Sequence, residues 1–277
     1  MRSVIVSPSG RRARVLLVVG LCGIALNACA AVDVATHPRT AQPERPSVAT
    51  HAGTVAPAYV EVETGLEHDR IDANMNVNQI PTVIKFGVTP RVQLSVSAPL
   101  SNGTGVALGV GDLAVGVKLN LVKDRPWLDD IAILPQVKFS TGGVRGTGTT
   151  DVSLLLINSR TFGPVGVDFN AGVTRRNGDN TQAPRTATFL TAAAGIPIYG
   201  NLGFALECFS YPGTSGPAGS PPIVGALFGP TLLLRPELAI DAGFIEPIHG
   251  PQPRAFYIGL VANLGRLPLP TRSARSH

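Results

Sequence analysis

Apolar and polar residues alternate along most of the chain beyond residue 58. In residues 112–122 every odd position from 113 to 121 is leucine or valine, whereas the even positions from 112 to 120 are Asp, Ala, Gly, Lys and Asn. A β-strand sends successive side chains to opposite faces, so this stretch has one aliphatic face and one small or polar face. The same alternation recurs in residues 91–98, 130–140, 165–174 and 256–264. The pattern predicts β-strands with two chemically different faces.

The alternating segments are numerous and long. We predict about twelve strands of roughly 9–11 residues, the length that a tilted strand needs to cross a bilayer. They cover residues 58–66, 81–89, 91–98, 112–122, 129–140, 151–161, 164–174, 186–196, 201–209, 223–234, 237–245 and 255–264. Short turns alternate with longer polar loops, which we place at 101–110, 141–150, 175–184, 211–222 and 246–253. The predicted fold is all-β: a transmembrane antiparallel β-barrel over residues 58–265, followed by a polar tail at 266–277.

Composition agrees with a barrel and excludes a helical bundle. Charged residues are 15% and hydrophobic residues 44% of the 277 residues, with 31 glycines and 24 prolines. The mean hydropathy is +0.22, yet only one apolar run resembles a membrane helix. Closed barrels and helices are the two backbones that satisfy their hydrogen bonds in lipid. A secreted or periplasmic β-sandwich that binds a ligand stays open as an alternative, because sandwich strands also alternate.

The N-terminus has the features of an export signal. Four arginines precede the apolar segment Val15–Leu26, which ends in small residues. We therefore predict a signal peptide at residues 1–29 and the outer membrane of a Gram-negative bacterium as the location. Two cleavage sites compete: an ordinary Ala28-Cys29-Ala30 site, and a lipobox in which Cys29 is the lipidation candidate.

Residues 30–57 are rich in proline, threonine and alanine and show no apolar periodicity. Such a composition is typical of a flexible leader or tether. His37 and His51 fall in this segment, and we interpret them as solvated linker residues.

The charge of the exported protein is nearly balanced. The formal charge is +5, and loss of residues 1–28 removes four arginines and no acids, which leaves about +1. We therefore expect no nucleic-acid partner. The expected partners are outer-membrane lipid, the barrel-assembly machinery and a small-molecule solute. No Cys/His cluster has metal-ligand spacing, so we expect no metal and no cofactor.

Charged side chains fall on the polar parity of the strands. The lumen-facing candidates are Lys85, Arg91, Asp112, Lys118, Lys138, Asp168, Glu207 and Asp241. An Arg or Lys facing lipid near the midplane would cost about 2–4 kcal/mol, which explains their confinement to one face. They either pair across a filled lumen or line a conduction path, with Lys118 and Asp112 the best candidates. Cys208 shares the parity of Leu206 and should face lipid.

Two short motifs resemble a known family. Residues 85–94, Lys-Phe-Gly-Val-Thr-Pro-Arg-Val-Gln-Leu, resemble an early hairpin of the outer-membrane proteins named for the phenol-degradation meta pathway, with Pro90 where that family commonly has an acid. Gly109-Val110-Gly111-Asp112-Leu113, followed by Gly116-Val117-Lys118, is similar to the same family's Gly-x-Gly-Asp stretch. The resemblance implies an outer-membrane barrel that passes hydrophobic or aromatic compounds and has no cofactor.

The sequence contains no convincing catalytic set, because neither His68 nor His249 has an obvious serine and acid partner. We expect a non-enzymatic barrel that passes small, hydrophobic or aromatic solutes through its lumen or wall. The alternative is a structural or binding barrel whose lumen is plugged. About twelve strands lies between the 8 that side chains fill and the 16 that leave a channel, so strand number does not decide between them.

Overall fold

The computed structural model describes residues 36–45, 47–71, 75–103, 106–177, 185–212 and 222–268. The signal peptide with Cys29, and the tail beyond residue 268, lie outside this part of the chain.

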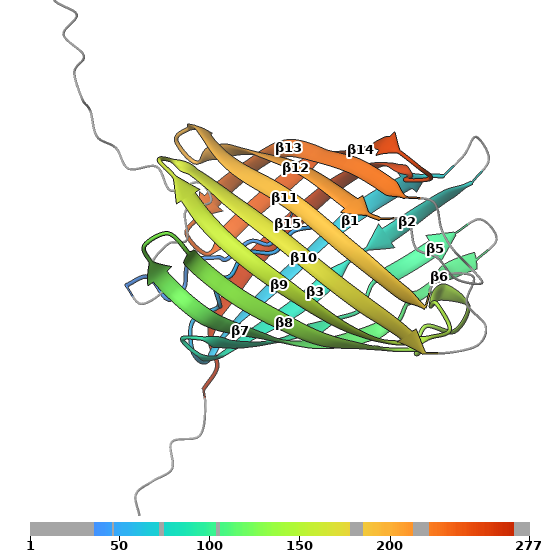
Figure 1. The fold of residues 1–277 in the computed structure, drawn as a ribbon, viewed down its shortest axis with the longest axis horizontal. Coiled ribbons are helices and arrows are strands. Elements are labelled where there is room, and N and C mark those ends of the chain that lie inside the picture. The colour runs from blue at the N-terminus through green and yellow to red at the C-terminus, as the bar shows by residue number, and fades with distance from the viewer. Residues whose placement is uncertain are drawn as a thin grey trace, which may run out of the picture.

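Twelve antiparallel strands form a closed barrel (Figure 1). The wall strands are β1 (Tyr59–Arg70), β3 (Thr82–Thr89), β4 (Val92–Ser97), β7 (Leu113–Arg125), β8 (Asp129–Phe139), β9 (Thr150–Phe162), β10 (Val165–Asn177), β11 (Thr186–Tyr199), β12 (Leu202–Tyr211), β13 (Ile223–Arg235), β14 (Leu238–His249) and β15 (Arg254–Arg266). Neighbours in this order pair with one another, and β15 pairs with β1 from Tyr59↔Arg266 to Arg70↔Arg254. The all-β barrel predicted from the alternation is confirmed.

Three neighbouring strands are interrupted and continue as shorter ones. The short strands are β2 (Asn76–Ile80), β5 (Leu100–Gly103) and β6 (Val106–Val110). Pro81, Pro99 and Gly111 lie in the breaks between β2 and β3, β4 and β5, and β6 and β7. Proline donates no ladder hydrogen bond, which explains the first two interruptions. The prediction of a loop at 101–110 was wrong, because β5 pairs with β6 there as a hairpin.

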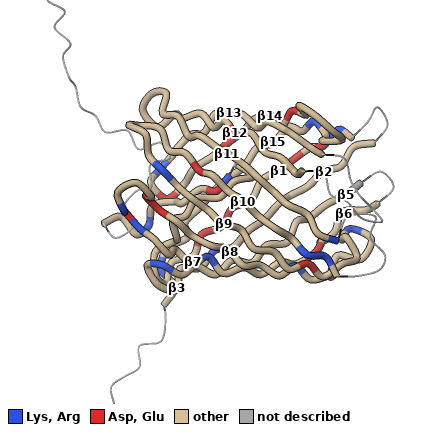
Figure 2. The backbone as a smooth tube through the Cα atoms, in the orientation of Figure 1, with Lys and Arg blue, Asp and Glu red and all other residues tan. Residues whose placement is uncertain are grey.

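The two faces of the wall differ as the alternation predicts. The outward face exposes large apolar side chains along almost every strand, including Ile84, Val115, Leu156, Leu206 and Ile258. Long stretches of the wall carry no charged residue (Figure 2). The inward face carries small residues together with buried polar and charged ones. A continuous exposed apolar surface of this kind is typical of the outward face of membrane barrels.

The two ends of the barrel also differ. Connections of two or three residues join β3–β4, β7–β8, β9–β10, β11–β12 and β13–β14 at one end, where β1 starts and β15 stops. We call this the short-turn end. The opposite end carries the longer connections, among them the 3-10 helix η1 (Gly143–Arg145). No helix among the described residues is long and apolar enough to cross a membrane.

If the outward face contacts lipid, a charged residue should destabilise the barrel more near the middle of the wall than near its ends. Leu156 lies in the middle of β9 and is 50% exposed. Leu156→Arg should lower the free energy of unfolding by about 2–4 kcal/mol in vesicles, because the guanidinium would face hydrocarbon. Leu128 is also 50% exposed but lies in the β7–β8 turn. Urea titration of Leu128→Arg should show a loss of about 1 kcal/mol or less. Equal losses for the two variants would contradict the assignment of the lipid-facing band.

Candidate functional site

The leader lies inside the barrel. Residues 36–45 and 47–57 contain no strand or helix, yet Thr40–Gln42, Ala49, Thr50 and most of 52–56 are buried. Figure 1 shows this segment in blue among the strands near the short-turn end. The prediction of a flexible leader was wrong for residues 36–57, because the inner wall fixes them through polar contacts. His51 is accordingly partly buried, whereas His37 is exposed as expected.

The leader follows a circuit around the inner wall. It begins at the short-turn end, where Ala41 N–H donates to the carbonyl of Pro236. It passes β1, reaches β12 and β10, then returns past β9 and β4. It leaves the lumen beside β3, where Pro57 bridges Gly87 and Ala58 N–H donates to the Gly87 carbonyl at 2.7 Å. Ala58 takes a left-handed φ of 69°, which turns the chain into β1.

Gly87 is the point of closest approach between the leader and the wall. A Cβ at this position would lie 2.1 Å from the carbonyl oxygen of Ala56 and 2.3 Å from that of Val55. Both contacts are with backbone, which a side-chain rotation cannot relieve. A glycine is therefore required for the leader to run against β3.

Wall side chains satisfy the backbone of the leader. N–H groups of Gln42 and Glu44 donate to the carboxylates of Glu61 and Glu63 at 2.6 and 2.8 Å. Val48 and Ala49 both donate to Glu207 at 2.8 Å. A buried segment without regular structure has unpaired N–H and C=O groups, each costly to bury alone. The carboxylates replace the partners that a strand or helix would supply.

Amides and a hydroxyl complete this set of partners. Asn170 accepts from Thr50 N–H at 2.8 Å and donates its own amide to the Thr50 carbonyl at 2.9 Å. Ser159 accepts from Ala52 N–H at 2.7 Å, and Gln93 accepts from Val55 N–H at 2.9 Å. Asn120 donates to the Ala52 carbonyl at 3.1 Å.

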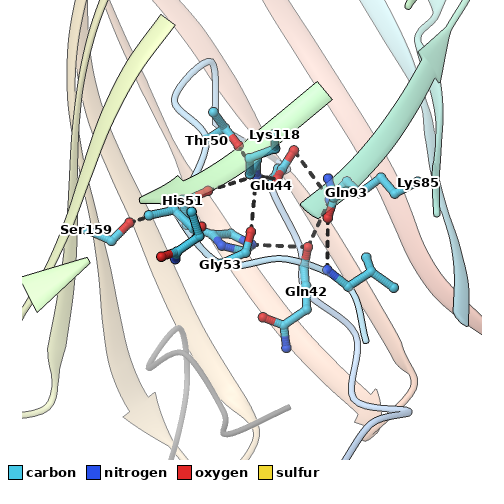
Figure 3. Close-up of polar contacts among 12 residues, drawn as sticks. Gln42, Glu44, Thr50, His51, Gly53, Lys85, Gln93, Lys118 and Ser159 are labelled. Atoms are coloured by element: carbon cyan, nitrogen blue, oxygen red, sulfur yellow. Dashed lines mark hydrogen bonds and ion pairs between the residues drawn. The ribbon is translucent and has the colours of Figure 1, made fainter. Parts of the chain in front are cut away.

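Lys118 makes the densest contact with the leader (Figure 3). Its Nζ donates to the Glu44 carboxylate, to Thr50 Oγ1 at 2.9 Å and to the carbonyls of His51 at 2.8 Å and Gly53 at 3.4 Å. Lys118 is 1% exposed. One wall ammonium thus contacts two parts of the leader, Glu44 on one side and residues 50–53 on the other.

Lys85 forms a second centre beside the first. Its Nζ lies 2.5 Å from Glu63, 3.3 Å from Glu61 and 3.4 Å from Glu44, and it also donates to the Gln42 carbonyl at 3.0 Å. Glu44 therefore bridges the two buried lysines. Charge-assisted hydrogen bonds of this kind are roughly twice as strong as neutral ones. We call Glu44, Glu61, Glu63, Lys85 and Lys118 the charged latch.

The charged latch tunes two titratable groups of the leader. Burial alone would raise the pKa of Glu44, but Lys118 and Lys85 outweigh it and hold that pKa well below its ordinary range. Burial, reinforced by Lys118, lowers the pKa of His51 to about 3, against the opposing charge of Glu44. Glu44 is therefore ionised and His51 neutral at pH 7. The His51 Nε2–H then donates to the Gln42 carbonyl at 3.3 Å.

Asp112 and Lys138 belong to a separate cluster at the opposite end of the barrel. Lys138 Nζ lies 2.8 Å from Asp112 and 3.4 Å from Asp151, which also lies 3.8 Å from Arg176. Asp112 accepts the N–H groups of Gly142 and Thr147 at 2.9 Å each. These contacts hold the β8–β9 connection against the wall. Asp112 directly precedes β7 and Lys118 lies within it, but the two residues hold different segments: Asp112 the β8–β9 connection and Lys118 the leader.

The remaining candidates lie in three settings. Glu207 is 1% exposed and holds the leader as described above, and Asp241 faces the lumen 3.9 Å from Arg45 of the leader. Asp168 also faces inward and accepts from Ser159 Oγ at 2.5 Å. Arg91 was predicted wrongly, because it is exposed in the β3–β4 turn, where the alternation has ended.

The leader leaves two cavities within the lumen. The larger, of about 620 Å³, is bordered by the leader and by residues of the short-turn end such as Asn201 and Pro236. The smaller, of about 240 Å³, is lined by Arg45, Val48, Tyr211 and Tyr257 among others.

The residues that hold the leader through neutral groups are not among those predicted from the sequence. Gln93, Asn120 and Asn170 lie on the polar parity of their strands, yet an uncharged amide did not suggest a contact with another segment. One feature of the sequence could have indicated this role: the same chain contains a proline-rich segment without apolar periodicity. Such a segment, if buried, requires side-chain partners for its backbone.

Other chemistry is sparse in the described residues. No group of three or more His, Cys, Asp and Glu side chains there is arranged to hold a metal ion. Cys208 is a free, exposed thiol on the outward face, which agrees with its parity.

Comparisons of structure place this chain among outer-membrane barrels. It superimposes on the COG4313 outer membrane channel from Pseudomonas putida F1 with a TM-score of 0.61 at 10% identity, covering 76% of this chain and 97% of that one. It superimposes on the KdgM porin with a TM-score of 0.50 at 10% identity, covering 73% and 98% of the two chains. No protein-family model matches the sequence, and no curated protein matches it. At this identity the comparisons establish the fold.

Lys118 is the most informative wall residue to change. Lys118→Met keeps the length of the side chain but removes the hydrogen bonds to Glu44, Thr50, His51 and Gly53. Amide hydrogen exchange in residues 47–55 should accelerate at least tenfold, since about 2 kcal/mol or more of charge-assisted bonding is lost. Lys138→Met removes an equivalent charge from the other cluster and should leave leader exchange unchanged. Equal exchange rates of residues 47–55 in the wild type and in Lys118→Met would contradict the role of Lys118 in holding the leader.

Docking of the leader should weaken in acid. His51 has a pKa of about 3 when docked, against 6.5 for a free histidine, so the docked state binds fewer protons below pH 6.5. Its docking energy is therefore complete above that value and falls by about 1.4 kcal/mol per pH unit below it. Hydrogen exchange corrected for its intrinsic pH dependence should report this between pH 7 and 5.

His51→Gln is the control for this pH dependence. Glutamine keeps a donor for the Gln42 carbonyl but does not titrate. All other side chains are the same in the two proteins, so the difference between the two profiles isolates His51. Identical dependence of leader exchange on pH in the two proteins would contradict the assignment of pH sensitivity to His51.

Proposed function

We propose that the protein is an outer-membrane channel for small solutes, closed in this state by its own leader. The observation that carries the proposal is the docking of residues 36–45 and 47–57 in the lumen, mainly through hydrogen bonds and ion pairs, with small apolar contacts at Ala41 and Ala52. Lumen side chains satisfy the leader backbone, and no disulfide among the described residues ties the leader to the wall. Undocking would replace these contacts with water and leave a polar bore.

The fold gives the direction of the molecule. Short turns and both chain ends face the periplasm in bacterial outer-membrane barrels. The leader thus enters from the periplasmic side, which also suits a signal peptide over residues 1–29 that ends near Cys29. We further propose that the barrel-assembly machinery inserts the chain and that lipid contacts its apolar band.

Hydrophobic or aromatic compounds are the proposed solutes. The motif resemblance around residues 85–94 and 109–118 favours them, and the likeness in fold to an outer-membrane channel and a porin is compatible with solute passage. The competing function is a structural barrel that stays sealed. The sealed structural barrel is disfavoured by the buried charges of the leader and wall. In a permanent plug, well-packed apolar residues could replace these charges without loss of stability.

Removal of the leader tests the proposal. Deletion of residues 36–56 should produce stable single-channel conductance in planar bilayers, whereas the full chain should be closed or open only briefly. Lys118→Met should raise the open fraction of the full chain without removing any residue of the leader. Heat-dependent gel migration shows whether each variant retains a folded barrel, and Lys138→Met is the matched control.

Two results would overturn the proposal. A folded barrel that conducts nothing after the deletion, with Lys118→Met equally silent, would identify a sealed structural barrel. Equal conductance of the full chain and the deletion variant would show that the leader does not close the pore.

A further inference from the structure

The larger cavity has two chemically different walls. It contains about 620 Å³, a volume within the usual 300–1,000 Å³ range of small-molecule sites. One side is formed by the ends of β7–β10 and the other by β11–β14, with the leader across the inner end. Gly200, Asn201 and Pro236 of the short turns border it, so the cavity lies next to the short-turn mouth of the barrel.

The side formed by β7, β8 and β10 is acidic. It carries Asp124, Asp130 and Asp168, and none of these forms an ion pair with another described residue. Asp130 accepts the Asp124 N–H at 2.8 Å and Asp168 accepts from Ser159, which leaves further carboxylate lone pairs unused. These three carboxylates are therefore free to pair with a cationic group that enters the cavity.

The arginines of the cavity do not reverse this charge. Arg160 lies 3.5 Å from Asp129, and Arg45 lies 3.9 Å from Asp241. Each guanidinium is thus accompanied by its own carboxylate. Glu44, the remaining carboxylate of the cavity, is bound by Lys118 and Lys85.

The opposite side is mostly apolar, with Thr231 and Asp241 as its polar members on β11–β14. Ala193, Ala205, Leu233 and Ala239 line it. Asp241 lies on the same side and is 6% exposed. Its Oδ1 atom faces Arg45 Nε at 3.9 Å, too far for a hydrogen bond, and is buried without a hydrogen-bond donor. A buried carboxylate oxygen without a donor costs free energy until one is supplied. This oxygen is therefore suited to a donor that arrives with a ligand.

We propose that this cavity binds small organic cations, with an ammonium or amidinium group among the aspartates and an apolar or aromatic body against β11–β14. A carboxylate or phosphate ligand would be repelled by the unpaired aspartates. A neutral ligand would leave the Asp241 oxygen and the acidic wall without their strongest partner. This proposal rests on the proposed channel function, of which it names the solute class.

Binding can be measured on the closed, full-length protein in detergent, independently of conduction. The probes are phenethylammonium, neutral 2-phenylethanol and anionic phenylacetate, which share a similar apolar body. Calorimetry should show tightest binding of phenethylammonium, weakening with salt because the contact is ionic. The neutral alcohol should bind at least tenfold more weakly and phenylacetate more weakly still.

Two conservative variants assign the site. Asp130→Asn and Asp168→Asn keep the oxygens that accept from Asp124 N–H and Ser159, so the fold is preserved, but each removes one charge. Each should weaken phenethylammonium binding about threefold to tenfold. Glu246→Gln removes one charge at the opposite end of the barrel and should leave binding unchanged.

The outcomes separate this inference from the channel. Equal affinity for the three probes, or an equal loss in Glu246→Gln, would overturn the cation site and leave the channel proposal standing. Selective cation binding with no conductance after the leader deletion would retain the site and overturn the channel.

Discussion

The structure depends on one constraint: a chain segment without regular structure lies in a closed lumen, and its backbone groups must still be paired. A strand or helix would pair them internally, but residues 36–57 do neither. The inner wall therefore supplies carboxylates at Glu61, Glu63 and Glu207 and an amide at Asn170. The polar content of the lumen is set by the leader as much as by any solute.

The need to pair buried groups also explains why the charged latch has two lysines but three glutamates. Two lysines face three glutamates, and Glu44 is the only one of the five that belongs to the leader. When the leader is docked, Glu44 gives Lys118 its carboxylate partner. Without Glu44, Lys85 still has Glu61 and Glu63, whereas Lys118 loses its carboxylate. The stability of the docked state is thus concentrated at Lys118, while Lys85 keeps the wall intact in either state.

The sequence predicts the wall better than its contents, for a physical reason. Successive side chains of a barrel strand point alternately outward and into the lumen, so residues 112–122 could be assigned to two faces without knowing their neighbours. The alternation no longer predicts the direction of a side chain where a strand ends, as at Arg91 in the β3–β4 turn. The backbone of the leader is held by wall side chains 19 to 159 positions away. Its proline-rich composition is the same for a tether and for a docked segment. Only the three-dimensional placement of Asn170 or Gln93 distinguishes the two.

The chemistry of the leader suits reversible closure. Its buried side chains are mostly alanine and threonine, which contribute little apolar area, so the hydrophobic effect adds little to docking. Each neutral backbone hydrogen bond contributes only about 0.5–1.5 kcal/mol net, because water replaces it on release. Several such bonds, with the latch, hold the leader firmly while leaving it sensitive to single changes of charge. A plug of large apolar residues would gain more from burial and would lack this sensitivity, because no titration or competing cation weakens an apolar contact.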